Sequence, residues 1–298
     1  MNGILIIDKP KDFTSFDVIA KLRKNLGQRK IGHMGTLDPM ATGVLPILLG
    51  DTAKFQIFVP DKNKSYTTKV KLGITTDTLD ITGKLISEQK SKIIKQDLER
   101  VLKSFLGEIY QIPPMFSAIK KDGVKLCDLA RNGISVDREK RKVFIKGIKI
   151  INFDFENQEA EISVDCSKGT YIRTLCDDIG RELGCGATVS ELRRTSSNGF
   201  SESNAWTLTK IMDMNMEDIS RNCVLPTESL FESLPTAHVT SAHSFRFKHG
   251  GALSVERVKF SISPRTSVSY KVYTDSKFVG LGKIDETSDE LKVLKCLK

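Results

Sequence analysis

The residues best suited to chemistry lie in a glycine- and proline-rich stretch, residues 32–46, which reads GHMGTLDPMATGVLP. Three glycines and two prolines in this stretch exclude a regular helix or a central strand. Because such a loop is costly to order, we expect the fold to hold it in place for a purpose. It carries one carboxylate, Asp38, and one imidazole, His33. From these residues alone, Asp38 is either a lone catalytic carboxylate or the start of an Asp-Pro turn with His33 packed against it.

A second cluster of interest is CSKGTYIR, residues 166–173. A predicted strand ends here, a glycine turns the chain, and Tyr171 and Arg173 are presented where a predicted helix begins. An arginine at such a place is either an ordinary surface charge or the partner of a carboxylate, because a nearby cation lowers a carboxyl pKa. The sequence alone leaves both interpretations open.

Basic residues are in surplus, since 46 lysines and arginines against 37 aspartates and glutamates give a formal net charge of +9. Such a surplus is common on proteins that bind phosphate backbones, and it also occurs on enzymes without such a partner. In ELRRT, residues 191–195, the basic pair Arg193-Arg194 follows Leu192, and such a pair is a candidate for contacts with phosphates. The charged segment 120–142 is either a solvated excursion on the surface or a basic thumb that grips a polyanion.

Other kinds of site lack their motifs in this sequence. There is no G-x-x-x-x-G-K-[ST] and no G-x-G-x-x-G after a strand, so no nucleotide, nicotinamide or S-adenosylmethionine fingerprint is visible. His238, His243 and His249 are spaced too irregularly for one helical face, and no ligand-spaced cysteine or carboxylate accompanies them. A G-x-S-x-G elbow is missing as well. We therefore expect no cofactor and no metal, and a carboxylate that acts alone.

The sequence also predicts where the protein works. The longest apolar run, residues 43–50, is less than half of the ~20 residues that a membrane-spanning helix needs. Met1 leads straight into ILIID with neither a basic lead nor a small-residue cleavage site, which argues against a signal peptide. The six cysteines include no C-x-x-C pair, and scattered thiols fit a reducing compartment. We expect a cytoplasmic protein without membrane contact.

The elements that must position these residues alternate between strand and helix patterns over about the first 230 residues. Strand patterns occur at residues 4–7, 44–49, 66–72, 143–145, 148–155, 161–166 and 189–194. Helical patterns occur at residues 15–26, with Ser15 as the cap, and at residues 98–105 and 172–183. Because several strands follow one another without a helix between them, we predict an α+β fold with a mixed, mostly antiparallel sheet and flanking helices.

The length of 298 residues suggests about two domains at roughly 150 residues each. From about residue 231 short β-rich pieces dominate, at residues 258–261, 267–273 and 278–281. Pro226 and Pro235 bracket an expected linker just before them. We predict a catalytic domain over residues 1–230, with residues 120–142 as an insertion, and a small β-barrel-like domain over residues 231–298.

Taken together, these clusters resemble the tRNA pseudouridine synthase B family, whose members isomerise the T-loop uridine, position 55, of transfer RNA. The matching segments span about residues 3–210 in the family's order. They are GILIIDKP (3–10), Thr14-Ser15, the loop 32–46, KSY (64–66), PPMFSA (113–118), GTYIR (169–173) and VSELRRT (189–195). Met34 stands where relatives often have threonine.

The C-terminal part is similar to the RNA-binding appendage called a PUA domain. The matching segments are FKHG, residues 247–250, and residues 271–281. The turn reads Gly250-Gly251 where relatives often have Gly-Gln. The resemblance therefore implies a PUA-like RNA-binding domain over residues 231–298.

The resemblance implies a catalytic role for three residues. Asp38 matches the catalytic aspartate of the family, and Arg173 is its implied partner, holding the carboxylate ionised and aimed. Tyr66 matches the tyrosine that stacks on the target base and that is a candidate for accepting the proton lost from C5. A phenol has an ordinary pKa near ~10, so as a base Tyr66 would need help from its surroundings.

The resemblance also implies how the substrate is held. Tyr171 and Leu192 correspond to residues that line the base pocket, and His33 to the histidine that stabilises the rearranged loop around the flipped-out nucleotide. Lys9, Arg193 and Arg194, together with the segment 120–142, are expected to contact the RNA backbone. Core packing is the alternative for the pocket residues, and architectural support is the alternative for Lys9.

The implied partner is the T-arm of tRNA, bound by a monomer that needs no other protein and no guide RNA. Three other functions are weighed against this one. The first is a non-catalytic protein that binds or remodels tRNA. The second is a guide-RNA-dependent pseudouridine synthase, a class that needs partner proteins and usually carries long charged tails. The third is a metal-dependent hydrolase, which would lose activity with a chelator.

Overall fold

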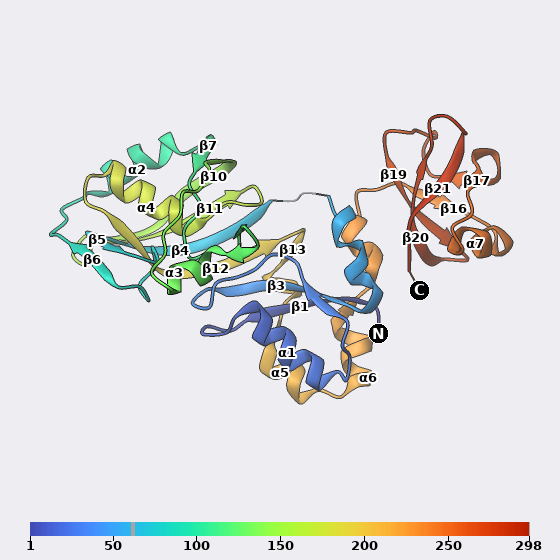
Figure 1. The fold of residues 1–298 in the computed structure, drawn as a ribbon, viewed down its shortest axis with the longest axis horizontal. Helices are drawn as coiled ribbons and strands as arrows, with labels where there is room; N and C mark the ends of the chain where they lie inside the picture. Colours follow the sequence, from blue (N-terminus) through green and yellow to red (C-terminus); the bar gives the residue numbers. More distant parts are fainter. Residues whose placement is uncertain (61–62, 298) are drawn as a thin grey trace.

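The computed structural model describes residues 1–60 and 63–297. Its main sheet has the strand order β14-β1-β3-β12-β4-β11-β10-β7, and β2, β13 and β15 pair beside this path. The strands from β1 to β7 in this order are labelled in Figure 1. In chain order the strands of this sheet are β1 (Gly3–Lys9), β2 (Ile31–His33), β3 (Thr42–Leu49), β4 (Lys64–Leu72), β7 (Gly107–Gln111), β10 (Arg141–Asp154), β11 (Glu159–Cys166), β12 (Ala187–Ser197), β13 (Phe200–Ser201), β14 (Trp206–Thr207) and β15 (Val224–Leu225).

The pairing within the main sheet is mixed and mostly antiparallel, as predicted. β1 pairs with β14, and β3 with β12, in the parallel sense. Antiparallel pairs join β1 to β3, β12 to β4, β4 to β11, β11 to β10 and β10 to β7. β10 is one strand where two were predicted, because shifts in register at Ile145/Gly147 and Ile150/Asn152 interrupt the side-chain alternation without ending the pairing.

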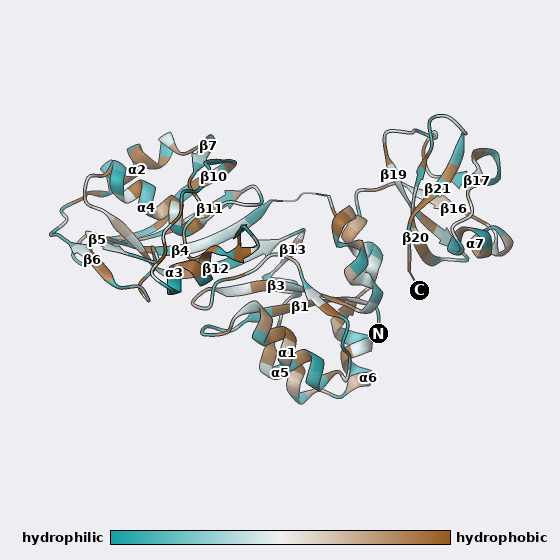
Figure 2. Ribbon diagram, in the orientation of Figure 1, coloured by the Kyte–Doolittle hydropathy of each residue, from teal (hydrophilic) through white to brown (hydrophobic). Residues whose placement is uncertain are grey.

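Helices flank this sheet, and the predicted α+β fold class is confirmed. The apolar side chains of α1 and α4 pack into one core with strands of the sheet; Val18, Leu22, Leu175 and Ile179 belong to it together with Ile7. α1 carries both hydrophobic and hydrophilic stretches (Figure 2), as a helix lying on a core must. No described helix is long and apolar enough to cross a membrane. The helices are α1 (Ser15–Asn25), α2 (Lys95–Ser104), α3 (Leu126–Arg131), α4 (Ile172–Glu182), α5 (Leu208–Asp213), α6 (Met216–Asp218) and α7 (Ser241–Lys248).

The start of α1 differs from the prediction, because Thr14 and not Ser15 caps it. The Thr14 hydroxyl accepts a hydrogen bond from the Asp17 N–H at 3.0 Å, and the Asp17 carboxylate accepts one from the Thr14 N–H at 2.8 Å. This reciprocal pair is a capping box. Ser15 is buried, and its hydroxyl accepts from the Leu37 N–H at 2.9 Å. Ser15 therefore ties the helix to the loop that holds Asp38.

A second sheet, of order β17-β21-β20-β19-β16-β18, is formed from the C-terminal part of the chain. It encloses a core of its own that includes Phe247, Tyr270, Val272 and Leu291. The small, β-barrel-like C-terminal module that the sequence predicts is therefore present. Its strands are β16 (Thr236–His238), β17 (Leu253–Ser254), β18 (Lys259–Phe260), β19 (Ser269–Thr274), β20 (Lys277–Ile284) and β21 (Glu290–Cys296).

The segment between Pro226 and Pro235, expected to be a linker, is a packed piece of the core. It contains the 3-10 helix η4 (Thr227–Phe231), in which Leu230 and Phe231 are fully buried. Phe55, from the 3-10 helix η1 (Gly50–Phe58), lies with its ring centroid 6.0 Å from that of Phe231 and 5.9 Å from that of Phe278 in β20. Phe55 and Phe231 share one hydrophobic core with Ile6 of β1, Leu48 of β3 and Leu281 of β20, and this core joins the second sheet to the first.

Two hairpins lie outside both sheets. One is formed by β5 (Ile74–Thr76) and β6 (Leu85–Glu88), and the other by β8 (Lys120–Lys121) and β9 (Val124–Lys125). The loop between β5 and β6 returns to the main sheet, where Asp80 bridges to Val189 of β12. This return brings the loop, which is far from Asp38 in sequence, to the side of the sheet on which Asp38 lies.

Candidate active site

The loop that carries Asp38 is fastened to β12 by a buried arginine. Arg194 has no exposed surface, and its guanidinium donates to the carbonyls of Val44 at 2.8 Å and Gly35 at 3.0 Å. At Gly43 a side chain is excluded, because a Cβ there would lie 2.2 Å from the Arg194 carbonyl oxygen. The close approach of these two chains explains a glycine with a φ of +101° at the end of the loop.

The same loop is fastened on its other side by Lys9 at the end of β1. The ammonium of Lys9, a residue with no exposed surface, donates to the carbonyls of Pro39 at 3.2 Å, Pro10 at 2.7 Å and Phe13 at 2.6 Å. Burial lowers the pKa of Lys9 to about 8, while the nearby Asp38 charge opposes this shift. The Asp-Pro turn itself is closed by a hydrogen bond from the Ala41 N–H to the Asp38 carbonyl at 3.1 Å.

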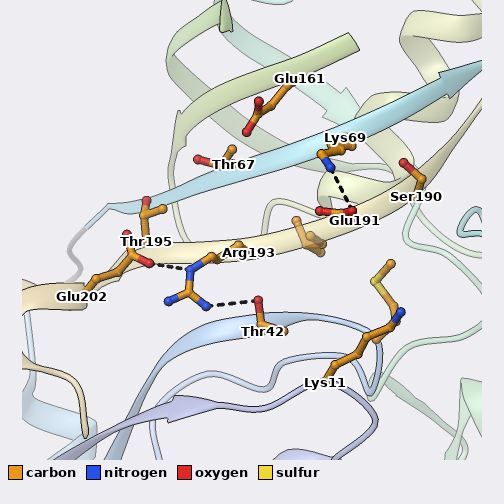
Figure 3. A pocket seen from close by; sticks show the side chains of 12 residues that line it. Lys11, Thr42, Thr67, Lys69, Glu161, Ser190, Glu191, Arg193, Thr195 and Glu202 are labelled. Carbon is orange, nitrogen blue, oxygen red and sulfur yellow. Dashed lines mark hydrogen bonds and ion pairs between the residues drawn. The ribbon is translucent and has the colours of Figure 1, made fainter. Parts of the chain in front are cut away.

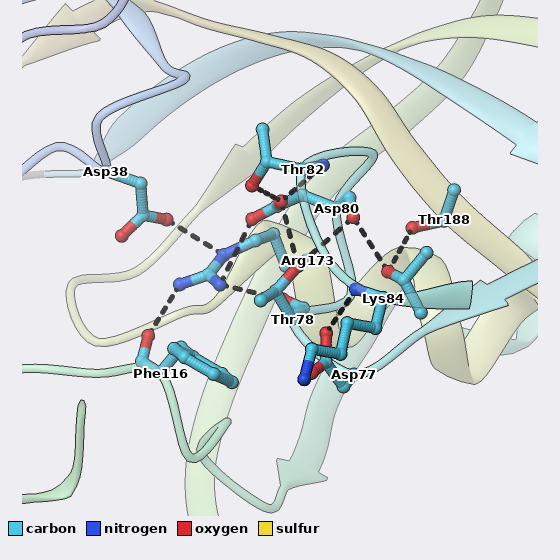
Figure 4. A network of polar contacts seen from close by, with 10 residues as sticks. Asp38, Asp77, Thr78, Asp80, Thr82, Lys84, Phe116, Arg173 and Thr188 are labelled. Carbon is cyan, nitrogen blue, oxygen red and sulfur yellow. Dashed lines mark hydrogen bonds and ion pairs between the residues drawn. The ribbon is translucent and has the colours of Figure 1, made fainter. Parts of the chain in front are cut away.

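The carboxylate of Asp38 is bound by Arg173, at the start of α4 (Figure 4). Arg173 Nε lies 2.9 Å from Asp38 Oδ2. The rest of the guanidinium is also engaged: Nη1 donates to the Thr78 carbonyl at 2.8 Å and lies 3.3 Å from Asp80 Oδ2, and Nη2 donates to the Phe116 carbonyl at 2.8 Å. The ion pair between Asp38 and Arg173, expected from the resemblance, is thus part of a wider network.

Asp80 is the member of this network that the sequence analysis missed. It is buried, and its Oδ1 accepts from the Thr78 hydroxyl at 2.9 Å and from the Thr82 N–H at 3.1 Å. Two hydrogen bonds hold the loop to β12: the Ile81 N–H donates to the Val189 carbonyl at 2.8 Å, and the Val189 N–H donates to the Leu79 carbonyl at 3.2 Å. Carboxylates flanked by threonines are common in turns, so the sequence contained no signal for a contact with Arg173.

The charge state of Asp38 reflects two opposing effects. Its side chain keeps 34% of its surface exposed, and the walls around it exclude much of the water that would solvate the carboxylate. This desolvation raises the pKa of Asp38 above its ordinary value, Arg173 opposes the rise, and the negative charge of Asp80 adds to it. The sequence-based expectation that Arg173 lowers this pKa describes one contribution, and burial outweighs it.

Asp38 lies in a cavity of about 220 Å³. Five residues predicted for the site, Asp38, Tyr66, Tyr171, Arg173 and Leu192, line it. Among the described residues that line this cavity, Asp38 alone carries a carboxylate. The complete lining is Thr36, Leu37, Asp38, Lys64, Tyr66, Ser117, Ala118, Gly169, Thr170, Tyr171, Ile172, Arg173 and Leu192.

Tyr66 is the most deeply placed aromatic side chain of this cavity, with only 7% of its surface exposed. Burial raises the pKa of its phenol, and the guanidinium of Arg194 beside it only partly offsets that rise. A phenol with a raised pKa is a poor base at neutral pH. Its ring, in contrast, is well placed to form a hydrophobic wall.

Tyr171 is fixed through its backbone by Gln111, a buried residue that the sequence analysis also missed. The Tyr171 N–H donates to Gln111 Oε1 at 3.0 Å, and Gln111 Nε2 donates to the Tyr171 carbonyl at 3.2 Å. Burial raises the pKa of the Tyr171 phenol, which lies beside the Ser117 hydroxyl. Two aromatic side chains and Leu192 therefore give the cavity walls that suit a planar ring.

His33 does not belong to the described lining of this cavity. It is the last residue of β2 and pairs with Ile47 of β3. Desolvation and the charge of Arg194 lower the pKa of its imidazole, so the ring is neutral at pH 7. Its Nδ1 is buried and has no hydrogen-bond partner among residues 1–60 and 63–297.

Burial removes two of the three expected RNA-backbone contacts, Lys9 and Arg194, from the surface. Lys9 and Arg194 are fully buried and bind loop carbonyls. Arg193 points to the other face of β12, where Nη2 lies 2.9 Å from Asp8 Oδ2. Its Nε pairs with Glu202, as Figure 3 shows. Alternation along the strand separates the two arginines, and two carboxylates balance the charge of Arg193.

The segment 120–142 consists of the β8–β9 hairpin, α3 and an extended return into β10. Lys120 and Lys121 are exposed, and Arg138 ties the return to the Pro113 carbonyl at 3.0 Å. Leu126 is buried and anchors the segment. The segment is therefore a basic surface held to residues 113–118, which lead directly to the cavity wall at Ser117.

Comparison with known proteins extends this description. Residues 23–172 match the model of the TruB family pseudouridylate synthase N-terminal domain, and residues 173–232 match that of the tRNA pseudouridylate synthase B C-terminal domain. The tRNA pseudouridine synthase B of Clostridium tetani is 41% identical to the chain over 298 residues, covering 100% of both. The same enzyme of Pseudomonas fluorescens is 39% identical over 289 residues, covering 96% of this chain and 92% of the relative.

Solved structures are similar to the chain over nearly its whole length. The structure of an H/ACA RNP bound to a substrate RNA containing 2'-deoxyuridine has a TM-score of 0.74 and 25% identity, and covers 99% of this chain and 85% of that one. A Cbf5-Nop10-Gar1 complex has a TM-score of 0.73 and 27% identity, and covers 99% of this chain and 84% of that one.

Proposed function

The chain belongs to the TruB family of pseudouridylate synthases and is an isomerase, and we propose that it converts the T-loop uridine of transfer RNA to pseudouridine. The observation that carries the proposal is the carboxylate of Asp38, held by Arg173 in a cavity with aromatic walls. The bacterial relatives that match nearly the whole chain are named for activity on tRNA, which supports this substrate.

The reaction needs a group that acts beside the sugar–base bond. The C1′–N1 bond breaks, the uracil turns, a C1′–C5 bond forms, C5 loses a proton and N1 gains one. Positive charge develops on the sugar as the first bond breaks, and a nearby carboxylate stabilises this charge or forms a covalent intermediate. Asp38 is proposed for this role, because Arg173 binds one of its oxygens and the cavity surrounds the carboxylate.

Arg173 and Asp80 are proposed to position the catalytic carboxylate. The guanidinium binds two carboxylates and two carbonyls at once, so its plane is fixed on several sides. A carboxylate that is misplaced by about 1 Å loses about 100-fold in rate. The network therefore sets the direction from which Asp38 meets the nucleotide.

The aromatic walls are proposed to bind the uracil after it leaves the stack. Flipping a base costs a few kcal/mol, and stacking on an aromatic side chain returns about 1–3 kcal/mol. Tyr66 is the stacking wall, and Tyr171 and Leu192 bound the same cavity. Because burial raises the pKa of Tyr66, the ring and not the hydroxyl is its contribution.

RNA outside the cavity is proposed to contact basic surfaces, among them the segment 120–142 and the PUA-like domain at residues 231–298. Lys120 and Lys121 are exposed on the first of these. Neutralising phosphates releases counterions, so binding to the T-arm is expected to weaken steeply as the salt concentration rises.

A single chain is proposed to suffice for the reaction. Every residue named for the cavity and the positioning network comes from this one chain, so a monomer contains the whole proposed site. A guide-RNA-dependent enzyme would be inactive without its RNA and partner proteins. Activity of the purified protein on tRNA alone separates these two functions.

The test is to incubate the purified protein with an unmodified tRNA transcript and to map pseudouridine at each position. We expect product at the T-loop uridine and nowhere else, with no guide RNA added. The matched control is a transcript with cytidine at that position, which should give none. Binding without any product in the first transcript would favour a tRNA-binding or tRNA-folding protein instead.

A further inference from the structure

Lys64, at the start of β4, is a cation in the Asp38 cavity that the proposed chemistry does not use. It is half-buried and lines the cavity together with Tyr66, two residues further along the strand. Side chains two apart on a strand point to the same face, which explains why both reach the cavity. Arg173, the other cation of the lining, already binds two carboxylates and two carbonyls.

The ammonium of Lys64 lies beside Gly35, a residue without a side chain. A Cβ on Gly35 would lie 3.1 Å from Lys64 Nζ and 3.4 Å from Arg194 Nη1. Gly35 also has a φ of +82°, a conformation that favours glycine. The turn therefore leaves room for a lysine ammonium close to the loop that carries Asp38.

Two cations, Arg194 and Lys168, act on Lys64 from nearby. Burial, and after it the charges of Arg194 and Lys168, lower the pKa of Lys64 to about 8, so the ammonium is charged at neutral pH. The thiol of Cys166 is nearby as well, and burial raises its pKa to about 11, so it is uncharged. Among residues 1–60 and 63–297, Lys64 forms no ion pair with a carboxylate. A positive site of this kind attracts an anion.

We propose that Lys64 binds a backbone phosphate next to the flipped-out uridine and thereby seats the sugar against Asp38. The inference rests on the proposed function, because the phosphate arrives with the RNA. Each nucleotide that enters the cavity is attached to phosphates on both sides, and an ammonium is a compact point charge suited to one of them. Arg194 supports this site by its charge while its own hydrogen bonds hold the loop.

The first test measures the affinity of a T-arm RNA over a range of salt concentrations. Losing one phosphate contact lowers the slope of log affinity against log salt by about 1. We expect this for Lys64→Met, together with a raised KM, whereas Lys64→Arg keeps the wild-type slope. Lys103→Met, which removes an exposed lysine on α2, is the matched control and leaves the slope unchanged. A wild-type slope for Lys64→Met overturns the inference.

A second test changes the RNA and uses the wild-type protein, so it does not depend on how a variant folds. One neutral methylphosphonate linkage replaces the phosphate on either side of the target uridine. We expect one of the two linkages to weaken wild-type binding as much as Lys64→Met does, and to have no further effect on that variant. Equal losses for the wild type and the variant would show that Lys64 contacts another part of the RNA.

The outcomes also separate this inference from the proposed function. If the wild type forms no pseudouridine in tRNA, the proposed function fails. If it forms pseudouridine while Lys64→Met keeps both the slope and the phosphate sensitivity of the wild type, only the assignment of Lys64 fails.

Discussion

Arg173 Nε lies 2.9 Å from Asp38 Oδ2, so the first turn of α4 fixes a carboxylate that belongs to a distant loop. The same guanidinium lies 3.3 Å from Asp80 Oδ2. Because Arg173 and Asp80 are almost completely buried, water competes little for these contacts. Asp38 is the exposed end of the network. Its orientation depends on Arg173, which lines the cavity, and on Asp80, which does not.

Replacing Arg173 tests whether its shape matters beyond its charge. Arg173→Lys keeps one positive charge and loses the planar fork that reaches Asp38 and Asp80 together. We expect kcat to fall by about 100-fold, since a small displacement of a reacting group has that effect. Arg173→Met also leaves buried carboxylate charge unpaired, which costs about 3–5 kcal/mol of stability. Single-turnover assays and thermal unfolding measure the two effects; a wild-type kcat for Arg173→Lys would contradict the positioning role.

The role of Asp80 is visible in the pH dependence of Asp80→Asn. The negative charge of Asp80 raises the pKa of Asp38, so removing it lowers that pKa. Activity needs ionised Asp38 and is lost as the pH falls through its pKa. We therefore expect the acid limb of the rate profile to move to lower pH, while the plateau falls because Arg173 is held less firmly. An acid limb that stays in place or moves to higher pH would contradict this role.

Two adjacent residues separate loop anchoring from helix capping. Ser15→Ala removes the acceptor of the Leu37 N–H, and a buried N–H without a partner costs about 1–3 kcal/mol. Thr14→Ala removes the cap of α1 and costs about 1 kcal/mol. We expect denaturant titration to show a similar loss of stability for both variants and kinetics to show a lower kcat for Ser15→Ala alone. An equal kcat in the two variants would contradict the anchoring of the loop by Ser15.

Substitutions at Tyr66 separate its ring from its hydroxyl. Burial raises the pKa of the phenol, so we expect Tyr66→Phe to keep most of its activity at neutral pH. Tyr66→Leu loses the stacking surface and should weaken the reaction by about 1–3 kcal/mol in kcat/KM. If Tyr66→Phe is inactive and Tyr66→Leu is no worse, the hydroxyl takes part in the reaction.

Local patterns in the sequence predict much of the fold. The alternation of Tyr66, Thr68, Val70 and Leu72 gives the strand β4, in which each of these residues is buried. The order of strands without intervening helices gives the mixed sheet, and the glycine-rich loop marks the place of Asp38. These features depend on residues that are close together in the sequence, so they can be predicted from a single sequence.

The parts that the sequence did not predict depend on contacts between distant segments. Asp80 meets Arg173 because its loop pairs with Val189, and no local pattern announces that pairing. Burial of Arg194 and exposure of Arg193 follow from strand alternation, and could have been read from the apolar Leu192 on the same face as Arg194. The capping box is likewise visible in the sequence, as Thr14 followed three positions later by the acidic Asp17.

The most direct test of the catalytic account compares Asp38→Asn with the wild type on the same tRNA. The substitution keeps the shape of the side chain and removes its charge. We predict that the single-turnover rate of pseudouridine formation falls by more than about 10⁴-fold while tRNA binding is retained. Formation of pseudouridine at a rate near that of the wild type would show that the carboxylate of Asp38 is not the reacting group.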